Sequence, residues 1–321
     1  MTNSAAHLFP LAATIAGATP NSGLRARLKK VAPRPLPHTD GRTQHLQRMR
    51  AVAGGRSDDL VFVGGSAAAV WGLPMLGAWP PTVEALAGRH ERSRQNGAVS
   101  WRRSDIGDDD LEAVGPWFVT TLARTLCDLA VSAPFVAAVS ALDHGLKPTV
   151  TADGGRVYCG VEREELIDLL RRRRNDRGRT RALAAIGFAD PAAASSGESL
   201  SRVQAYRLGF PPPLLHPRVD DERGAAEHPH FEWQTAYGEF DGVDRYARAL
   251  PDGARPTADV IWNERRREDR LRGRGKAVAR WTWEDAWNPP RLRSILLSVG
   301  VRPVRRAAFS PDAFGEWVMS A

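Results

Sequence analysis

The order of the elements expected after residue 190 constrains the fold of this chain more than any other feature of its sequence. Residues 190–197 (DPAAASSG) are small and polar, which is typical of a linker between domains. After them, hydrophobic patterns predict a helix at 198–208, strands at 214–219, 229–234 and 236–240, a basic helix at 263–274, a strand at 277–283 and a helix at 290–299. A strand meander followed by helix, strand and helix is typical of a mixed sheet, so we predict an α/β domain over 190–321.

Residues 51–189 predict a separate α+β middle domain. Strands are expected at 60–63, 83–86 and 98–102, and Ser66 is expected to cap a helix that ends at Gly72. The turn Gly64-Gly65-Ser66 is also typical of nucleotidyltransferases, but those enzymes need an acidic pair on the next strand and only Glu84 is present. Residues 1–50 form an N-terminal segment rich in proline, which interrupts regular structure.

Composition limits the classes of partner and compartment. The formal net charge of +8 favours a polyanion such as DNA, because basic side chains displace counterions from phosphate. Only four of the 45 basic residues are lysine, so the charge is equally compatible with a compositional bias toward arginine. No apolar run approaches the roughly 20 residues that span a bilayer, so we expect no membrane association. The two cysteines lack any metal-ligand spacing, and we expect a cytoplasmic protein.

Three carboxylates in the last third of the chain form the strongest candidate site. Glu198 lies in the first turn of its predicted helix, and Glu239 and Asp241 are two residues apart on a strand, where both project from one face. Divalent cations that assist phosphodiester hydrolysis prefer oxygen ligands supplied by several elements. The alternative is that Glu198 complements the helix dipole and the strand acids form salt bridges. The residues alone leave both interpretations open.

Three motifs in this region occur together and in order: Ser196–Val203 (SGESLSRV), Gly238–Tyr246 (GEFDGVDRY) and Glu264–Trp283 (ERRREDRLRGRGKAVARWTW). They resemble the C-terminal region of AbiEi-like antitoxins of type IV toxin–antitoxin systems. That region is similar to the very-short-patch-repair-like branch of the PD-(D/E)XK nuclease superfamily. The resemblance covers about residues 190–300. It implies a restriction-endonuclease-like domain, a central sheet flanked by helices, with a Mg²⁺ site that hydrolyses DNA.

The resemblance assigns roles to individual residues. Glu198 matches the helix glutamate of the family, and Glu239 and Asp241 match its Glu-x-Asp motif. Arg245 falls where the family usually has a lysine. The resemblance therefore implies a catalytic set of Glu198, Glu239, Asp241 and Arg245.

One position departs from the pattern. The family sequence is roughly Val-Asp-Phe-x-Trp, and this chain has Pro-His-Phe-Glu-Trp at 229–233, so His230 occupies the position of the central aspartate. An imidazole is a poor ligand for Mg²⁺. Glu232, on the same strand face, is the candidate replacement, which gives a metal set of Glu198, Glu232, Glu239 and Asp241. We expect cleavage to be weak or absent, and His230→Asp to improve it.

The middle region carries the same resemblance at 62–74 (FVGGSAAAVWGLP) and 119–130 (VTTLARTLCDLA). Arg124 and Asp128 are four residues apart on a predicted helix, so they either form an ion pair or leave Arg124 facing DNA or a partner. Related antitoxins usually begin with a winged helix. Residues 1–50 are short and proline-rich for such a domain, so we expect it to be truncated or altered.

A basic stripe is expected on the helix at 263–274. Arg266, Arg270 and Arg274 recur every four residues and therefore lie on one face, which favours contact with a phosphate backbone. The alternative is a solvated helix whose arginines pair with the acids beside them.

These features predict a DNA-associated regulator or antitoxin with a nuclease-like, impaired C-terminal domain. Its expected partners are DNA and a toxin of the nucleotidyltransferase type. Two alternatives remain. One is a Mg²⁺-dependent DNA endonuclease, and the other is a module that binds a toxin without contacting DNA.

Overall fold

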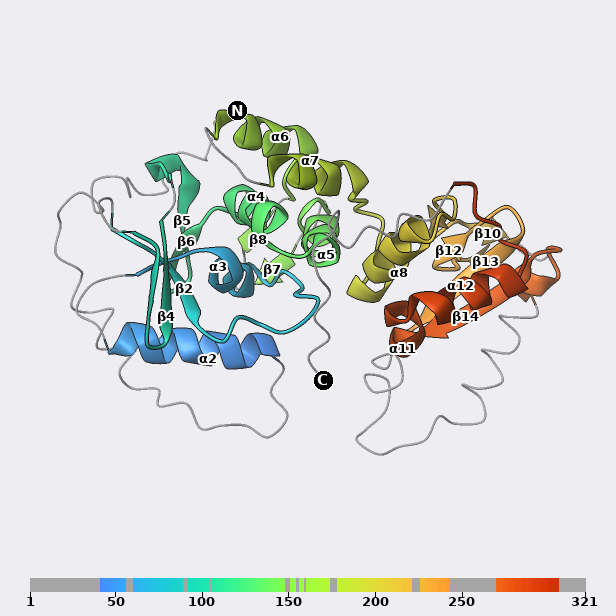
Figure 1. Cartoon of the computed structure of the whole chain (residues 1–321), viewed down its shortest axis with the longest axis horizontal. Helices are drawn as coiled ribbons and strands as arrows, with labels where there is room; N and C mark the ends of the chain where they lie inside the picture. The colour runs from blue at the N-terminus through green and yellow to red at the C-terminus, as the bar shows by residue number, and fades with distance from the viewer. Residues whose placement is uncertain are drawn as a thin grey trace, which may run out of the picture. The chain divides into compact units, whose positions relative to one another are not determined.

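The structure is a computed structural model that describes residues 41–55, 60–88, 92–103, 105–147, 151–153, 156–158, 160–173, 178–220, 226–242 and 270–305. By its internal contacts the chain divides into two compact units (Figure 1). Unit 1 contains the described residues up to Val131 and the helix after Glu162; unit 2 contains those from Ser132 to Glu162 and from Gly178 onward. Within the described ranges no helix has the length and apolar character needed to cross a membrane.

Unit 1 is built on a six-stranded mixed sheet in the order β3-β4-β2-β1-β6-β5. Its strands are β1 (Val61–Phe62), β2 (Val83–Leu86), β3 (Arg94–Asn96), β4 (Val99–Arg102), β5 (Leu111–Val114) and β6 (Trp117–Thr120). Its helices are α2 (Gly41–Gly54), α3 (Gly64–Trp71), α4 (Leu122–Ser132) and α6 (Arg163–Arg172), with a 3-10 turn η2 (Asp108–Asp110). The strands predicted at 60–63, 83–86 and 98–102 correspond to β1, β2 and β4.

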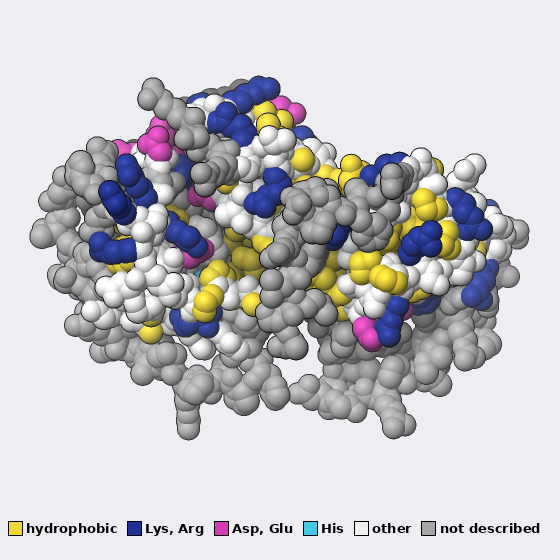
Figure 2. All heavy atoms as spheres, viewed as in Figure 1, with side chains coloured by type: hydrophobic (Ala, Val, Ile, Leu, Met, Phe, Trp, Pro, Cys, Tyr) yellow, Lys and Arg dark blue, Asp and Glu magenta, His cyan; other side chains and the backbone are white. Residues whose placement is uncertain are grey.

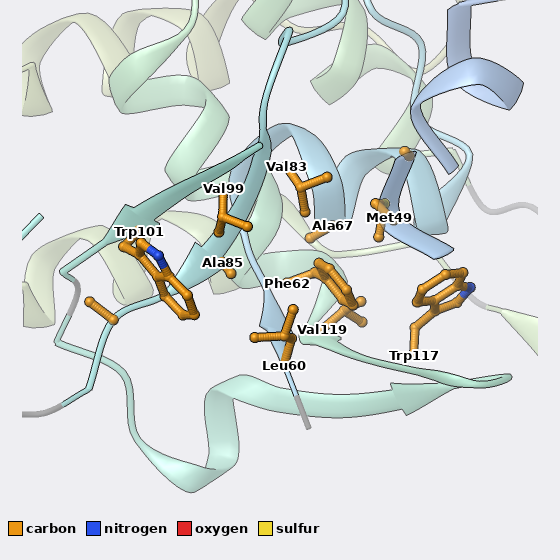
Figure 3. Packing of buried hydrophobic residues seen from close by; sticks show 12 residues of the cluster. Met49, Leu60, Phe62, Ala67, Val83, Ala85, Val99, Trp101, Trp117 and Val119 are labelled. Carbon is orange, nitrogen blue, oxygen red and sulfur yellow. The ribbon is translucent and has the colours of Figure 1, made fainter. Parts of the chain in front are cut away.

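The hydrophobic core of unit 1 lies between its sheet and helices α2 and α3. Figure 3 shows the side chains of this core, which come from the strands and from both helices. Phe62 of β1 meets the ring of Trp117 of β6 edge-on, with ring centroids 5.4 Å apart. Met49 of α2 and Ala67 of α3 are fully buried against the same strands. Apolar residues at every second strand position supply this core.

The prediction that Ser66 caps helix α3 is wrong. The helix begins two residues earlier, at Gly64, and Ser66 is buried inside its first turn. The Ser66 hydroxyl instead accepts a hydrogen bond from the backbone N–H of Glu84 (2.8 Å) and lies 2.8 Å from Nε2 of His45. Gly64 has φ +54, and a Cβ there would lie 2.7 Å from Oε2 of Glu84, so only glycine fits this turn.

Unit 2 is built on a four-stranded mixed sheet in the order β14-β13-β12-β9. The strands of this sheet are β9 (Leu214–Leu215), β12 (Phe231–Glu232), β13 (Ala236–Asp241) and β14 (Ala277–Thr282). Two separate two-stranded sheets are formed by β7 (Thr151–Asp153) with β8 (Arg156–Tyr158) and by β10 (Val219–Asp220) with β11 (Ala226–Glu227). Its helices are α5 (Phe135–Gly145), α7 (Arg179–Phe188), α8 (Ser196–Arg207), α11 (Trp283–Trp287) and α12 (Pro289–Ser298). Of the predicted basic helix, only its end is described, and residues 270–272 are helical.

Strand β13 is the centre of the unit 2 sheet. It pairs antiparallel with β12 and parallel with β14, and β12 pairs antiparallel with β9. Helices α8, α11 and α12 lie along this sheet (Figure 1), and Phe240 of β13 faces α8 so closely that a Cβ on Gly197 would lie 2.0 Å from its ring. Trp281 of β14 donates a hydrogen bond from Nε1 to the Ser201 hydroxyl of α8 (2.8 Å). Glu239, the strand neighbour of Phe240, therefore projects from the opposite face.

The prediction of a mixed α/β architecture with helices beside a mixed sheet is confirmed. The domain boundary near 190 remains a prediction, and the contacts group α5 and α7 with the C-terminal elements. Asp143 of α5 forms a buried ion pair with Arg202 of α8, Asp143 Oδ2 lying 2.9 Å from Arg202 Nη1. Asp143 also accepts hydrogen bonds from the Ser199 hydroxyl and from the backbone N–H of Asp190, both at 2.7 Å.

Candidate functional site

Glu198 lies at the first turn of α8, as the sequence predicts, and is 3% exposed. Ser195 caps the helix by accepting a hydrogen bond from the backbone N–H of Glu198 (3.3 Å). The Glu198 carboxylate folds back to accept hydrogen bonds from the backbone N–H of Ala194 (2.8 Å) and from the Ser195 hydroxyl (3.2 Å). Residues at the start of the helix therefore hold this carboxylate in place.

His216, in the segment after β9, completes the surroundings of Glu198. Its Nε2 lies 2.7 Å from Oε2 of Glu198, at 28% side-chain exposure for His216. The hydrogen bond to Glu198 raises the pKa of His216 above its ordinary value, although burial opposes the shift. Burial alone would raise the pKa of Glu198, but the hydrogen bonds from His216 and Ala194, together with the charge of His216, outweigh it and lower that pKa. The two directions agree: each group favours the charged form of the other.

The backbone of His216 is strained. Its φ of +44 lies in the left-handed region, and no other described residue except glycine has a positive φ. Such a conformation costs about 1–3 kcal/mol for a residue with a Cβ, and persists only where surrounding contacts hold it. Here the holding contacts are the Glu198 carboxylate and the carbonyl oxygen of His230, which accepts from the backbone N–H of His216 (3.2 Å).

His230 immediately precedes β12 and lies beside Glu239 of β13. Its Nδ1 accepts a hydrogen bond from the backbone N–H of Phe240 (3.0 Å) and lies 3.4 Å from Oε2 of Glu239. Glu239 is fully buried. The rings of His230 and His216 meet edge-on with centroids 5.6 Å apart. The two imidazoles therefore lie between Glu198 and Glu239: His216 contacts Glu198, and His230 lies beside Glu239.

The other two predicted carboxylates each contact a basic side chain of the region before or within β14. Oε1 of Glu232 lies 2.7 Å from Nζ of Lys276, which also donates to the carbonyl oxygen of Trp233 (3.0 Å). Oδ1 of Asp241 lies 3.7 Å from Nη1 of Arg280. Glu232 is opposite Tyr237 in the sheet, two residues along β13 from Glu239, or about 7 Å at the usual rise of a strand.

These contacts do not fit a Mg²⁺ ion. Within the ranges that the structure describes, no group of three or more His, Cys, Asp or Glu side chains is placed to hold a metal. Glu198 bonds His216, Glu232 bonds Lys276, and Glu239 faces an imidazole on the side of β13 opposite to α8. Mg²⁺ prefers octahedral oxygen ligands. The metal set and the catalytic set remain predictions that the described geometry does not support, and Arg245 lies outside the described residues.

The predicted basic stripe is described only in part. Arg266 lies outside the described residues, while Arg274 is exposed. Arg270 is also exposed, and its guanidinium pairs with Glu227, with Nε 2.7 Å from Oε1. Figure 2 shows Lys and Arg side chains scattered over the described part of one face rather than gathered into a single patch. The role of the stripe in DNA binding stays a prediction.

In unit 1, Arg124 does not face DNA or a partner. It is 1% exposed, and its guanidinium bonds Asp110 (2.8 Å), Asp128 (3.2 Å) and the carbonyl oxygen of Asp105 (2.9 Å). Asp128 also pairs with Arg173, the residue that follows α6 (2.9 Å). The ion pair predicted between Arg124 and Asp128 is thus present, as part of a buried network that joins α4, η2 and α6.

The Gly64-Gly65-Ser66 turn has a structural role in unit 1. Oε2 of Glu84 accepts the backbone N–H of Gly65 (2.6 Å), and Oε1 accepts from Nε of Arg102 (2.9 Å). The protein's own carboxylate therefore satisfies a backbone N–H at the start of α3.

The sequence pattern does not predict three residues of the unit 2 site: His216, Lys276 and Arg280. Each lies far along the chain from the carboxylate it contacts. Lys276 and Arg280 lie within the motif at 264–283, which assigns them no role, and His216 lies outside the three motifs. For His216 the sequence offered one weak signal, a histidine beside a proline within a predicted strand, as also at His230.

Comparison of the chain with protein-family models, with curated protein sequences and with solved structures gives no match.

Proposed function

We propose that this chain is a DNA-associated regulator of the antitoxin type, in which residues 190–321 of unit 2 form a restriction-endonuclease-like domain that binds DNA without cutting it. The observation that carries the proposal is the arrangement of Glu198, His230 and Glu239 around one sheet. The residues stand at the positions that the resemblance assigns to metal ligands, and yet they contact protein nitrogen atoms.

The order of elements in unit 2 supports the nuclease-like fold. Helix α8 carries Glu198, strand β12 begins after His230, and the next strand, β13, carries Glu239 and Asp241. Strand β14 then adds parallel to β13, and α11 and α12 lie along the sheet. A central mixed sheet with helices beside it, and with a helix glutamate and a Glu-x-Asp strand, is what the resemblance implies.

The chemistry of the site supports binding rather than cleavage. A metal-activated water needs a cation held by anionic oxygens. Here His230 occupies the aspartate position and its Nδ1 is engaged by the backbone of Phe240. Nε2 of His216 lies 2.7 Å from Oε2 of Glu198 and would compete with a cation for this carboxylate. Both contacts lower the affinity of the site for Mg²⁺ and its ability to position a nucleophile.

The cleavage test uses supercoiled DNA with MgCl₂ or MnCl₂. We expect no cutting by the natural protein. His230→Asp alone leaves Glu198 bonded to His216, so we expect little recovery from it. The double change His230→Asp with His216→Gly frees Glu198 and relieves the left-handed backbone, and we expect it to cut better than either single change. Robust cutting by the natural protein that Glu232→Gln abolishes would establish the alternative, an endonuclease.

The binding test measures affinity for unrelated duplexes in EDTA as salt is raised. The net charge of +8 supports a phosphate-dominated interaction. Replacing Arg266, Arg270 and Arg274 with Gln should weaken binding to all duplexes alike. It should also reduce the slope of log affinity against log salt by the amount expected for the loss of up to about three phosphate contacts. The control removes three arginines elsewhere in unit 2, namely Arg218, Arg291 and Arg293. Equal loss in both triple variants would show that charge alone matters, and no DNA binding at all would refute the proposal.

A toxin of the nucleotidyltransferase type is the partner that the antitoxin role implies. Co-expression with such a toxin from the same source should neutralise its growth inhibition. Neutralisation by a variant that no longer binds DNA would favour the module that binds a toxin alone.

A further inference from the structure

Three carboxylates that the resemblance assigns to a metal each contact a basic side chain of the protein. Glu198 lies 2.7 Å from His216, Glu232 lies 2.7 Å from Lys276, and Asp241 lies 3.7 Å from Arg280. The fourth, Glu239, faces the ring of His230.

The basic partners come from elements other than those that carry the acids. His216 follows β9 and reaches back to α8, Lys276 precedes β14 and reaches across to β12, and Arg280 lies on β14 beside β13. None is a helical neighbour at i+3 or i+4, the spacing at which surface pairs form by default. The pairing is therefore a property of the tertiary fold.

The surroundings of His216 show that its position is specifically held. The residue adopts a left-handed backbone, φ +44, that glycine would accept more readily. Its imidazole nevertheless lies on a carboxylate that is 3% exposed. A buried carboxylate without a compensating charge is strongly unfavourable, so this contact is what allows Glu198 to remain ionised inside the domain.

We propose that His216, Lys276 and Arg280 take the place of a divalent cation, so that unit 2 is stable without bound metal. The inference rests on the proposed nuclease-like fold, which supplies the expectation of a metal, and is independent of DNA binding. A Mg²⁺ ion would have to displace three side chains that already neutralise its ligands.

The test is the melting temperature (Tm) of the full chain in EDTA, in MgCl₂ and in MnCl₂. A metal present at a hundredfold excess over its dissociation constant raises the Tm by roughly 5–10 °C for a unit of this size. We expect the Tm of the natural protein to be the same in all three solutions. A rise of that size with either metal overturns the proposal.

The second arm asks whether the basic partner is needed. His216→Gln removes the imidazole beside Glu198, and its control Arg218→Gln removes a nearby charge that is 66% exposed and pairs with Asp220. We expect the Tm of His216→Gln to fall by several degrees and that of the control to stay within about 2 °C. If His216→Gln does not fold, Lys276→Gln is measured in its place. A variant as stable as the control overturns the proposal.

The two proposals fail separately. A natural protein whose Tm is insensitive to metal but which binds no DNA in EDTA retains this inference and loses the proposed function. A protein that binds DNA and is stabilised by MgCl₂ retains the function and loses the inference.

Discussion

Replacing Asp143 with alanine tests the polar interior of unit 2. The Asp143 side chain is 2% exposed and accepts from Arg202 (2.9 Å), from the Ser199 hydroxyl (2.7 Å) and from the backbone N–H of Asp190 (2.7 Å). Burial raises the pKa of Asp143 above its ordinary value, although the charge of Arg202 and the hydrogen bonds oppose the shift. The carboxylate is therefore held in place at a substantial desolvation penalty.

The magnitude follows from what Asp143→Ala leaves behind. Removing one partner of a buried ion pair costs about 3–5 kcal/mol, because the other charge stays buried without compensation. Arg202 keeps its hydrogen bond to the carbonyl oxygen of Phe188 (2.8 Å), and Ser199 keeps the carbonyl oxygen of Ser195 (3.3 Å). These remaining bonds favour the lower end of the range, about 3 kcal/mol, or a fall in Tm of roughly 6–12 °C.

The assay is thermal and urea unfolding of the full chain. Asp220→Ala is the matched control, because it breaks an exposed pair with Arg218 in the same unit and should cost no more than about 1 kcal/mol. The double change Asp143→Leu with Arg202→Met removes both charges and should recover most of the loss. The reasoning fails if Asp143→Ala is as stable as the control, or if the double variant is no more stable than the single one.

Three further predictions concern both units. Arg124→Met should lower the unfolding free energy of unit 1 by about 3 kcal/mol, which is the low end for a buried pair because Asp128 keeps its contact with Arg173. The same change should leave the salt dependence of DNA binding unchanged. A flatter salt dependence would mean that Arg124 contacts DNA. The pKa of His45 is lowered below its ordinary value of 6.5, mainly by burial and to a lesser extent by the charge of Arg48. The unfolded chain therefore binds the proton more readily than the folded chain, and unit 1 should lose stability as the pH falls below 6.5. Urea unfolding at a series of pH values measures this loss, which should disappear in His45→Gln. Gly197→Ala should lower the free energy of unfolding by about 1–3 kcal/mol, as measured by calorimetry, because the added methyl group would overlap the ring of Phe240. An unchanged Tm would mean that α8 can move away from β13.

Much of the local structure was predictable because it depends on patterns within one segment. Helices α4, α8 and α12 follow from hydrophobic residues at helical spacing. Strand β13 was also expected at its place. Ser66 was misjudged because a hydroxyl before an alanine-rich run predicts a cap, whereas the tertiary contact with His45 buries it inside the helix. Helix α11 was missed because it is only five residues long.

The partners of the carboxylates were not predictable from the sequence. A strand pattern places Glu239 and Asp241 on one face but carries no information about the element opposite them. His216 contacts Glu198 across 18 positions, and Lys276 contacts Glu232 across 44. The left-handed backbone of His216 is also invisible in its residue type, since glycine is the usual sign of that conformation.

The contacts change how the substitution at position 230 should be understood. From the sequence, His230 is a single damaged ligand in an otherwise complete metal site, so restoring aspartate would restore the chemistry. In the folded protein the neighbouring carboxylates already have partners: His216 on Glu198, and Arg280 beside Asp241. An aspartate at position 230 would add a negative charge next to the buried Glu239 without releasing any of the others. If unit 2 has the proposed nuclease-like fold, restoring aspartate at position 230 is therefore insufficient by itself, because His216 and Arg280 still contact the neighbouring carboxylates.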